Sequence, residues 1–363
     1  MVEVLREVTD ADLDAIEIGA AILGTGGGGN PYIGKLRCRE ELKKGRRIPV
    51  IPLDELPDDA LVVSLGGIGA PVVGVEKIEE GEECLRALRA IEKELDVTVD
   101  ALISVEIGGA NSMEPMLTAA QAGLPVVDGD GMGRAFPEMQ MCTWSIYGHR
   151  EAPGAMADEK GSIVVIRDTP DDLWLERIAR SVVVAMGAAA GLATQPMRGD
   201  FVKRAAIPNT ITQALNLGRA VLDAHETNAD PIQTIIAHEK GCLLMTAKIV
   251  DLERHLKGGF AIGHLSLEGF GAFAGDRGRI DLQNEFLIFR RNDVVEVCVP
   301  DLIVVLDSDT GLPITTEMLR YGQRIAVLGL PAHALMKTPA ALNVVGPAAF
   351  GYDDIMFKPM GDA

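Results

Sequence analysis

The first half of the chain alternates short apolar runs with amphipathic segments. The runs at residues 61–67, 101–106 and 124–127 are nearly continuous, which is typical of strands buried on both faces of a parallel sheet. Between them, residues 79–95 and 114–122 carry apolar side chains at helical spacing. This alternation predicts strand–helix–strand units and an N-terminal α/β domain with a largely parallel sheet.

The second half of the chain has a different pattern of apolar runs. After a helical stretch, short β-type runs are separated by Gly, Asp and Asn turns, at 243–250, 260–270, 279–289, 294–299 and 302–306. The apolar run at 181–193 is too short to span a bilayer and is interpreted as the end of a buried helix. We place a domain boundary near residue 170. Residues 1–170 form the α/β domain, and 171–363 form a mixed α+β domain that is helical first and then rich in β-strands.

The chain is strongly acidic, and this charge argues against some classes of binding partner. Its 363 residues carry a formal net charge of −19, without a stripe of Lys and Arg. Phosphate backbones and anionic membranes need a basic face, so we expect neither nucleic acid nor a membrane as partner. A small-molecule ligand is expected instead. An acidic α/β enzyme of this kind is often a homo-oligomer, which we keep as an expectation.

The cysteines and the chain start favour a cytoplasmic location. Five cysteines lie far apart and none forms a C-x-x-C pair, which argues against a zinc knuckle or a dithiol redox motif. The first residues lack the basic and then apolar profile of a signal peptide. Reduced cysteines in a cytoplasm fit both observations.

Glycines and polar side chains follow three of the predicted strands. The residues at these ends are Gly66 and Gly67, then Glu106, Gly108, Gly109 and Asn111, and finally Asp128 and Asp130. Parallel strands bring their carboxyl ends to one edge of a sheet, where open α/β sheets bind ligands. Glycine also lets backbone N–H groups approach a ligand closely. The sequence therefore predicts a site at this edge.

The carboxylates at this edge are candidates for acid–base chemistry. Glu106 ends an apolar strand, where an unpaired carboxylate is costly, so it either finds a partner or serves chemistry with a raised pKa. Asp128 and Asp130 share one face of an extended chain, which suits an acid–base pair or a metal ion. The alternative is a tight turn capped by Asp side chains. Arg134 either neutralises these carboxylates or clamps a substrate carboxylate.

A glycine loop follows the first predicted helix. Residues 24–29 match the string G-x-G-x-x-G, but a dinucleotide site requires the string to follow a strand. No nucleotide is therefore expected, and a nucleotide-dependent enzyme is the weakest hypothesis. The backbone of Gly26, Gly27, Gly28 and Gly29, with Asn30, is expected to hold a polar or anionic ligand. A structural hinge is the alternative.

Two motifs together carry a resemblance to a known family. The glycine loop at 24–32 and the segment at 128–138, which ends in Glu138, resemble the S-methyl thiohydantoin desulfurase family, which is associated with hydantoinase and oxoprolinase proteins. Later segments at 283–285, 300–303, 310–314 and 346–352 fit the same family. The resemblance covers nearly the whole chain and implies two domains divided near residue 170.

The resemblance implies a hydrolase that acts on a five-membered cyclic amide. Water would attack the ring carbon that bears the S-methyl group, and methanethiol would leave. As a hypothesis, Asp128 or Asp130 is the base and Glu138 or Glu106 the acid, while the loop amides and Asn111 hold the ring and Arg134 binds a substrate carboxylate. A divalent metal held by the carboxylates is left open. The alternative function is a non-catalytic partner or regulatory subunit of a hydantoinase-type enzyme.

Overall fold

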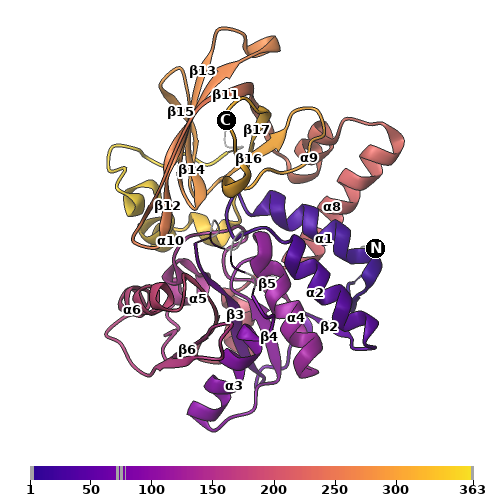
Figure 1. The fold of residues 1–363 in the computed structure, drawn as a ribbon, viewed down its shortest axis with the longest axis vertical. Helices are drawn as coiled ribbons and strands as arrows, with labels where there is room; N and C mark the ends of the chain where they lie inside the picture. Colours follow the sequence, from indigo (N-terminus) through magenta and orange to yellow (C-terminus); the bar gives the residue numbers. More distant parts are fainter. Residues whose placement is uncertain (1–3, 71–72, 74–76, 78, 361–363) are drawn as a thin grey trace.

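Two sheet-based lobes are stacked along the long axis of the molecule (Figure 1). The computed structural model describes residues 4–70, 73, 77 and 79–360. One lobe is built on a ten-stranded mixed sheet and the other on a seven-stranded antiparallel sheet. Within the described part of the chain, no helix is long and apolar enough to cross a membrane.

The first sheet has four parallel strands at its centre. Across the sheet these are β2 (Ile48–Pro52), β5 (Val126–Asp130), β4 (Ala101–Ser104) and β3 (Leu61–Gly69). The outer strands pair antiparallel: β1 (Glu7–Val8), β6 (Gly154–Ala157), β7 (Ile163–Ile166), β8 (Ala189–Ala193), β9 (Met197–Arg198) and β10 (Ile207–Pro208). Because β5, β4 and β3 run in one direction, the loops that follow them meet at one edge.

The helices of the structure are short to medium in length. Their bounds are α1 (Asp10–Leu23), α2 (Tyr32–Lys43), α3 (Glu83–Leu95), α4 (Met113–Ala122), α5 (Thr143–Ile146), α6 (Asp172–Ala185), α7 (Gly199–Ala205), α8 (Thr210–Thr227), α9 (Pro231–Glu239) and α10 (Pro339–Val345). Helix α1 begins after Thr9, where Asp12 accepts hydrogen bonds from Thr9 N at 2.9 Å and Thr9 Oγ1 at 2.6 Å. Helix α4 ends at Gly123, which is left-handed at φ 71°.

The second sheet is a meander of long hairpins with two further strands at one side. Its order is β15 (Val294–Cys298), β14 (Glu285–Arg291), β13 (Arg277–Gln283), β12 (Phe260–Gly269), β11 (Cys242–Lys257), β17 (Arg324–Leu330) and β16 (Leu302–Asp307). Along β16, Ile303 and Val305 pack into a hydrophobic core formed within the second lobe. Val304 and Leu306 point to the other face and pack into the core that contains α1. This strand is therefore buried on both faces and joins the two lobes through a shared core.

The fold class predicted from the sequence is confirmed: a mixed sheet with parallel central strands comes first, and a part rich in antiparallel strands with helices follows. Two element predictions were wrong in part. The run 181–193 ends helix α6 only as far as Ala185, because Gly187 (φ 90°) and Ala188 (φ 64°) turn the rest of it into strand β8. The run 279–289 is two strands, because Asn284 (φ 58°) makes the turn between β13 and β14.

The lobes do not divide where the sequence prediction placed the boundary. Strands β8, β9 and β10 follow residue 170 but lie in the first sheet, and the second sheet begins at β11. The boundary at residue 170 therefore stays a prediction about domains rather than a division between the sheets.

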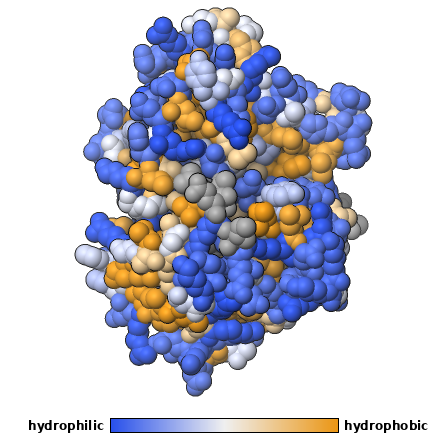
Figure 2. Space-filling view, viewed as in Figure 1, coloured by the Kyte–Doolittle hydropathy of each residue, from blue (hydrophilic) through white to orange (hydrophobic). Residues whose placement is uncertain are grey.

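An apolar patch lies on the outer face of the first lobe. Figure 2 shows apolar side chains gathered over the part of this face where Figure 1 draws α6. Leu173, Trp174, Ile178 and Val184 of this helix are between 38% and 56% exposed. The patch therefore belongs to the first lobe and not to the β-rich half of the chain.

Candidate active site

A cavity of about 510 Å³ is lined by residues of both lobes. The first lobe supplies the glycine loop, the residues that follow β4 and β5, and parts of β3 and β8. The second lobe supplies Asn284 and Glu285 at the turn into β14, and Glu317 and Met318 from the 3-10 helix η6 (Thr316–Met318). The size suits a small-molecule ligand.

Glu106 is the predicted catalytic carboxylate that lines this cavity. It is 3% exposed, and its carboxylate accepts hydrogen bonds from Asn111 Nδ2 at 2.6 Å and from Phe136 N at 2.9 Å. Burial, together with the charge of Asp130, raises its pKa to about 8. Asn111 is itself held by Gly67, whose N–H donates to Asn111 Oδ1 at 2.6 Å. Asn111 therefore orients Glu106.

Glu285 brings a second buried carboxyl to the same cavity from the other lobe. It is 2% exposed, and its Oε2 has no hydrogen-bond partner among the described residues. Burial and the nearby Glu106 raise its pKa well above the usual value. Two such carboxyls influence each other's protonation and titrate as a pair. Over part of the pH range, one of the two carboxyls is therefore neutral while the other is ionised.

The glycine loop lies between the two carboxyls. A Cβ on Gly27 would lie 2.0 Å from Glu285 Oε1, and a Cβ on Gly28 would lie 3.2 Å from Glu106 Oε1. Gly28 has a φ of 71°, a conformation that favours glycine. The glycines at these two positions thus let a carboxyl from each lobe approach one short stretch of backbone.

The basic side chains that line the cavity are paired with acidic ones. Arg37 donates to Glu79 at 2.7 Å, Lys77 lies 2.7 Å from Glu159, and Arg180 Nε donates to Glu176 at 2.7 Å.

A further carboxyl, that of Glu114, also lines the cavity, and burial raises its pKa to about 7.

The remaining predicted ligand residues divide into two groups. Those that line the cavity are Gly28, Gly29, Asn30, Gly66, Gly67 and Asn111. Gly26, Gly27, Gly108 and Gly109 do not line it. They pack closely within the protein, for example Gly26 against the ring of Phe286 and Gly108 against Gly24.

Asp128 and Asp130 lie behind the cavity wall, and neither lines it. Asp128 Oδ1 accepts from the backbone N–H of Ile211 and Thr212, and its Oδ2 accepts from Thr212 Oγ1. It therefore caps the N-terminus of α8. Asp130 is fully buried, and its Oδ2 accepts three backbone N–H groups from Ile107, Met132 and Gly133. It fixes the loops after β4 and β5, which is the turn-capping alternative raised by the sequence.

Arg134 and Glu138 also lie outside the lining. Arg134 is 0% exposed, and all five of its N–H donors are bound to protein oxygens, so none is left for a substrate carboxylate. Glu138 accepts a hydrogen bond from Gln140, and burial raises its pKa. Neighbouring Pro137 and Met139 line the cavity instead.

Sequence reasoning did not propose Glu285 as a site residue. Residues 283–285 contribute to the prediction only through the family resemblance. A usable signal was present, because Glu285 directly precedes the apolar residues 286–289 and is fully buried with them. A carboxylate at such a position needs a partner or a function.

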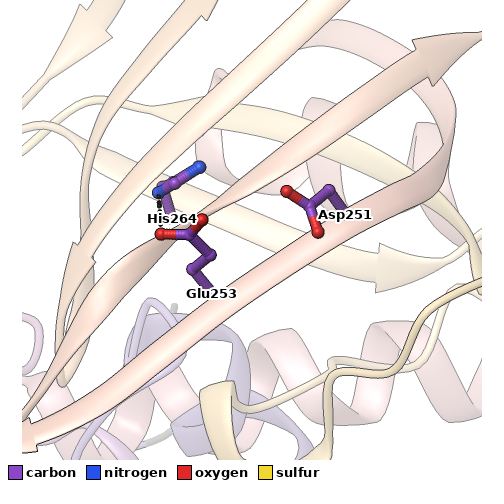
Figure 3. Close-up of side chains that lie close together, drawn as sticks. All are labelled: Asp251, Glu253 and His264. Carbon is purple, nitrogen blue, oxygen red and sulfur yellow. Dashed lines mark ion pairs between the residues drawn. The ribbon is translucent and has the colours of Figure 1, made fainter.

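A possible metal-ligand group lies elsewhere. Within the described ranges, Asp251, Glu253 and His264 offer ligand atoms that all lie within 4.8 Å of one another (Figure 3). They project from the paired strands β11 and β12, two of them are exposed, and none lines the cavity. Among the described residues, the carboxyls of the cavity do not form a group whose ligand atoms lie that close together.

Comparison with known proteins relates both parts of the chain to one family. Residues 11–168 match the family described as S-Me-THD-like, N-terminal domain, and residues 170–360 match S-Me-THD-like, C-terminal domain. A crystal structure of a protein from Chromobacterium violaceum is similar in fold, with a TM-score of 0.80 and 24% identity. The similarity covers 98% of this chain and 100% of that one. No curated protein matches the chain.

Proposed function

The chain belongs to the S-methyl thiohydantoin desulfurase-like family, and from this premise we propose that it is a hydrolase that converts an S-methyl thiohydantoin, or a closely related five-membered cyclic amide, into a hydantoin. The observation that carries the proposal is the pair Glu106 and Glu285. These two buried carboxyls with raised pKa values come from different lobes and line one cavity of small-molecule size.

The reaction requires one group that accepts a proton and one that donates it. In an S-methyl thiohydantoin, one ring carbon bears the methylthio group and shares a double bond with a ring nitrogen. The oxygen of water bonds to this carbon while an ionised carboxylate takes one water proton. A neutral carboxyl gives its proton to the ring nitrogen. These two transfers produce a tetrahedral intermediate.

The intermediate then loses its sulfur. The carbon–sulfur bond breaks, and the departing thiolate takes the proton from the first carboxyl and leaves as methanethiol. The remaining hydroxyl proton returns to the second carboxyl as the ring carbonyl forms. Both carboxyls regain their starting protonation, and the product is a hydantoin.

The contacts of each carboxyl favour one assignment of roles. Two N–H donors reach the carboxylate of Glu106, and hydrogen bonds of this kind stabilise the ionised form. Glu285 Oε2 lacks such a donor in the described structure, and its pKa is raised well above normal. We therefore assign Glu106 as the base that activates water and Glu285 as the acid.

The test follows methanethiol release from an S-methyl thiohydantoin by purified protein. We expect Glu106→Gln and Glu285→Gln each to reduce kcat by about 100-fold or more, because each removes one proton-transfer group. Glu138→Gln is the matched control, since Glu138 is another carboxyl whose pKa is raised by burial but does not line the cavity. Full activity in both cavity variants would refute the assignment.

The alternative function is tested in the same experiment. A non-catalytic partner of a hydantoinase-type enzyme would bind the ring without releasing thiol. A ligand at about 100 times its Kd stabilises a protein by roughly 2.7 kcal/mol, which a thermal-shift measurement detects. Stabilisation without turnover would therefore support the binding protein over the hydrolase.

A further inference from the structure

We propose that Arg134 is the positioning residue of this site, which holds Glu285 of one lobe at its working distance from Glu106 of the other. This inference rests on the proposed function, because it assigns roles to the same two carboxyls. Arg134 lies outside the cavity and touches neither carboxylate through a hydrogen bond. Its effect is therefore exerted through the backbone segments that it joins.

The hydrogen bonds of Arg134 connect four segments of the chain. Within the first lobe, Nε donates to Ala135 O at 3.0 Å and Nη2 to Thr25 Oγ1 at 2.8 Å. Ala135 directly precedes Phe136, whose N–H holds Glu106, and Thr25 is the second residue of the glycine loop. Both first-lobe contacts thus lie next to a residue that shapes the site.

Three further contacts reach into the second lobe. Nη2 also donates to Phe286 O at 3.1 Å, next to Glu285, and Nη1 donates to Pro300 O at 3.2 Å and Asp301 O at 2.9 Å. The planar guanidinium has five donors in a fixed arrangement, so one side chain sets all these segments relative to one another. Displacing it would remove these contacts between the backbone next to Glu285 and the backbone next to Glu106.

The charge of Arg134 supports this role. Its five acceptors are neutral oxygens, so its positive charge is left to act on the surrounding carboxyls. The guanidinium opposes the upward shift in the pKa of both Glu106 and Glu285. A buried positive charge behind the pair thus favours the state in which one carboxyl is ionised, which is the state that the reaction uses.

The experiment compares Arg134→Lys with Arg134→Gln, using Arg150→Gln as the control. Arg150 also donates to two backbone carbonyls, of Thr169 and Pro170, but lies outside the cavity lining. We expect both Arg134 variants to lose about 100-fold in kcat with little change in KM, since misplacement by about 1 Å costs that much. The control should keep the kinetics of the unmodified protein.

The pH profile separates positioning from simple stability. Arg134→Lys keeps the charge, so the acidic limb of its kcat/KM profile should stay in place. Arg134→Gln removes the charge and should move that limb upward by about one pH unit. Residual activity in Arg134→Gln with an unshifted limb would mean that the residue is merely structural, and would overturn the proposal.

A second measurement does not depend on turnover. Carbon-13 NMR titration of glutamate-labelled protein, assigned with Glu106→Gln and Glu285→Gln, reports the carboxyl pKa values directly. If no tested ring is hydrolysed, the proposed function fails, while an upward pKa shift in Arg134→Gln still supports the role of Arg134. Where Arg134→Gln does not fold, Thr25→Val removes a single acceptor and should give a smaller loss in kcat. Normal kinetics in both Thr25→Val and Arg134→Lys would overturn the proposal.

Discussion

At the scale of single residues, the protonation of Glu106 decides when the site can work. Its pKa is raised to about 8 by burial, so at neutral pH it is mostly protonated and cannot accept a proton from water. The pKa of Glu285 is raised well above its usual value by burial and by Glu106 itself. The window between these two titrations is the range in which one carboxyl is charged and the other neutral.

We predict that kcat/KM rises with pH through about pH 8 and falls again at higher pH. The rise follows ionisation of the base, and the fall follows loss of the proton from the acid. A pH profile of methanethiol release in a constant ionic-strength buffer checks this. Activity that is maximal at pH 5 and declines steadily above it would contradict the assignment.

Single residues also show how much of the site could be predicted from the sequence. Glu106 was selected because a carboxylate at the end of an apolar strand is costly, and the structure places it in the cavity. Asp128 and Asp130 are predicted as a pair because they share one face of an extended chain, but hydrogen bonds to backbone N–H groups of distant segments hold these two in place. Partners such as Ile211, which is 83 residues away from Asp128, cannot be inferred from local pattern.

At the scale of elements, Asp128 joins β5 to the start of α8. We predict that Asp128→Ala lowers the free energy of unfolding by about 1–2 kcal/mol, because the helix start loses its cap. Its kcat should change less than that of Glu106→Gln. Denaturant unfolding and steady-state kinetics together test this, with Asp230→Ala at the start of α9 as a control for loss of a helix cap.

The loop between α1 and α2 gives a second prediction at this scale. Gly27 has no left-handed backbone angle, so Gly27→Ala should be tolerated by the backbone itself. Its new Cβ would nevertheless displace the Glu285 carboxyl, which is 2.0 Å from that position. We expect a loss of at least tenfold in kcat with the fold retained. Gly154→Ala in β6 is the control, because its nearest contact would be an ordinary 3.5 Å.

Element boundaries were predictable where local chemistry sets them. The start of α1 and the end of α4 depend on residues within a few positions, Asp12 beside Thr9 and the left-handed Gly123. Strand β8 was missed because its Ala-rich sequence has no strand preference of its own; its pairing with β3 and β6 decides its structure. The order of strands in the sheet is likewise a non-local property.

At the scale of the whole molecule, one core runs through both lobes. It contains Ile16 and Leu23 of α1 together with Val304 and Leu306 of β16. Lobes joined in this way are expected to unfold together. We predict a single calorimetric transition in which the calorimetric and van't Hoff enthalpies agree. Two resolved transitions would show that the lobes are independent.

The burial of Glu106 and Glu285 has a consequence for folding. In the unfolded chain both carboxyls face water and ionise near their ordinary pKa; in the folded protein their pKa values are raised, so protons are taken up from solution on folding. The stability that this uptake provides is complete below about pH 4.5 and is lost as the pH rises through about 8. Folding is therefore itself an acid–base reaction, and protons from the buffer are one of its reactants.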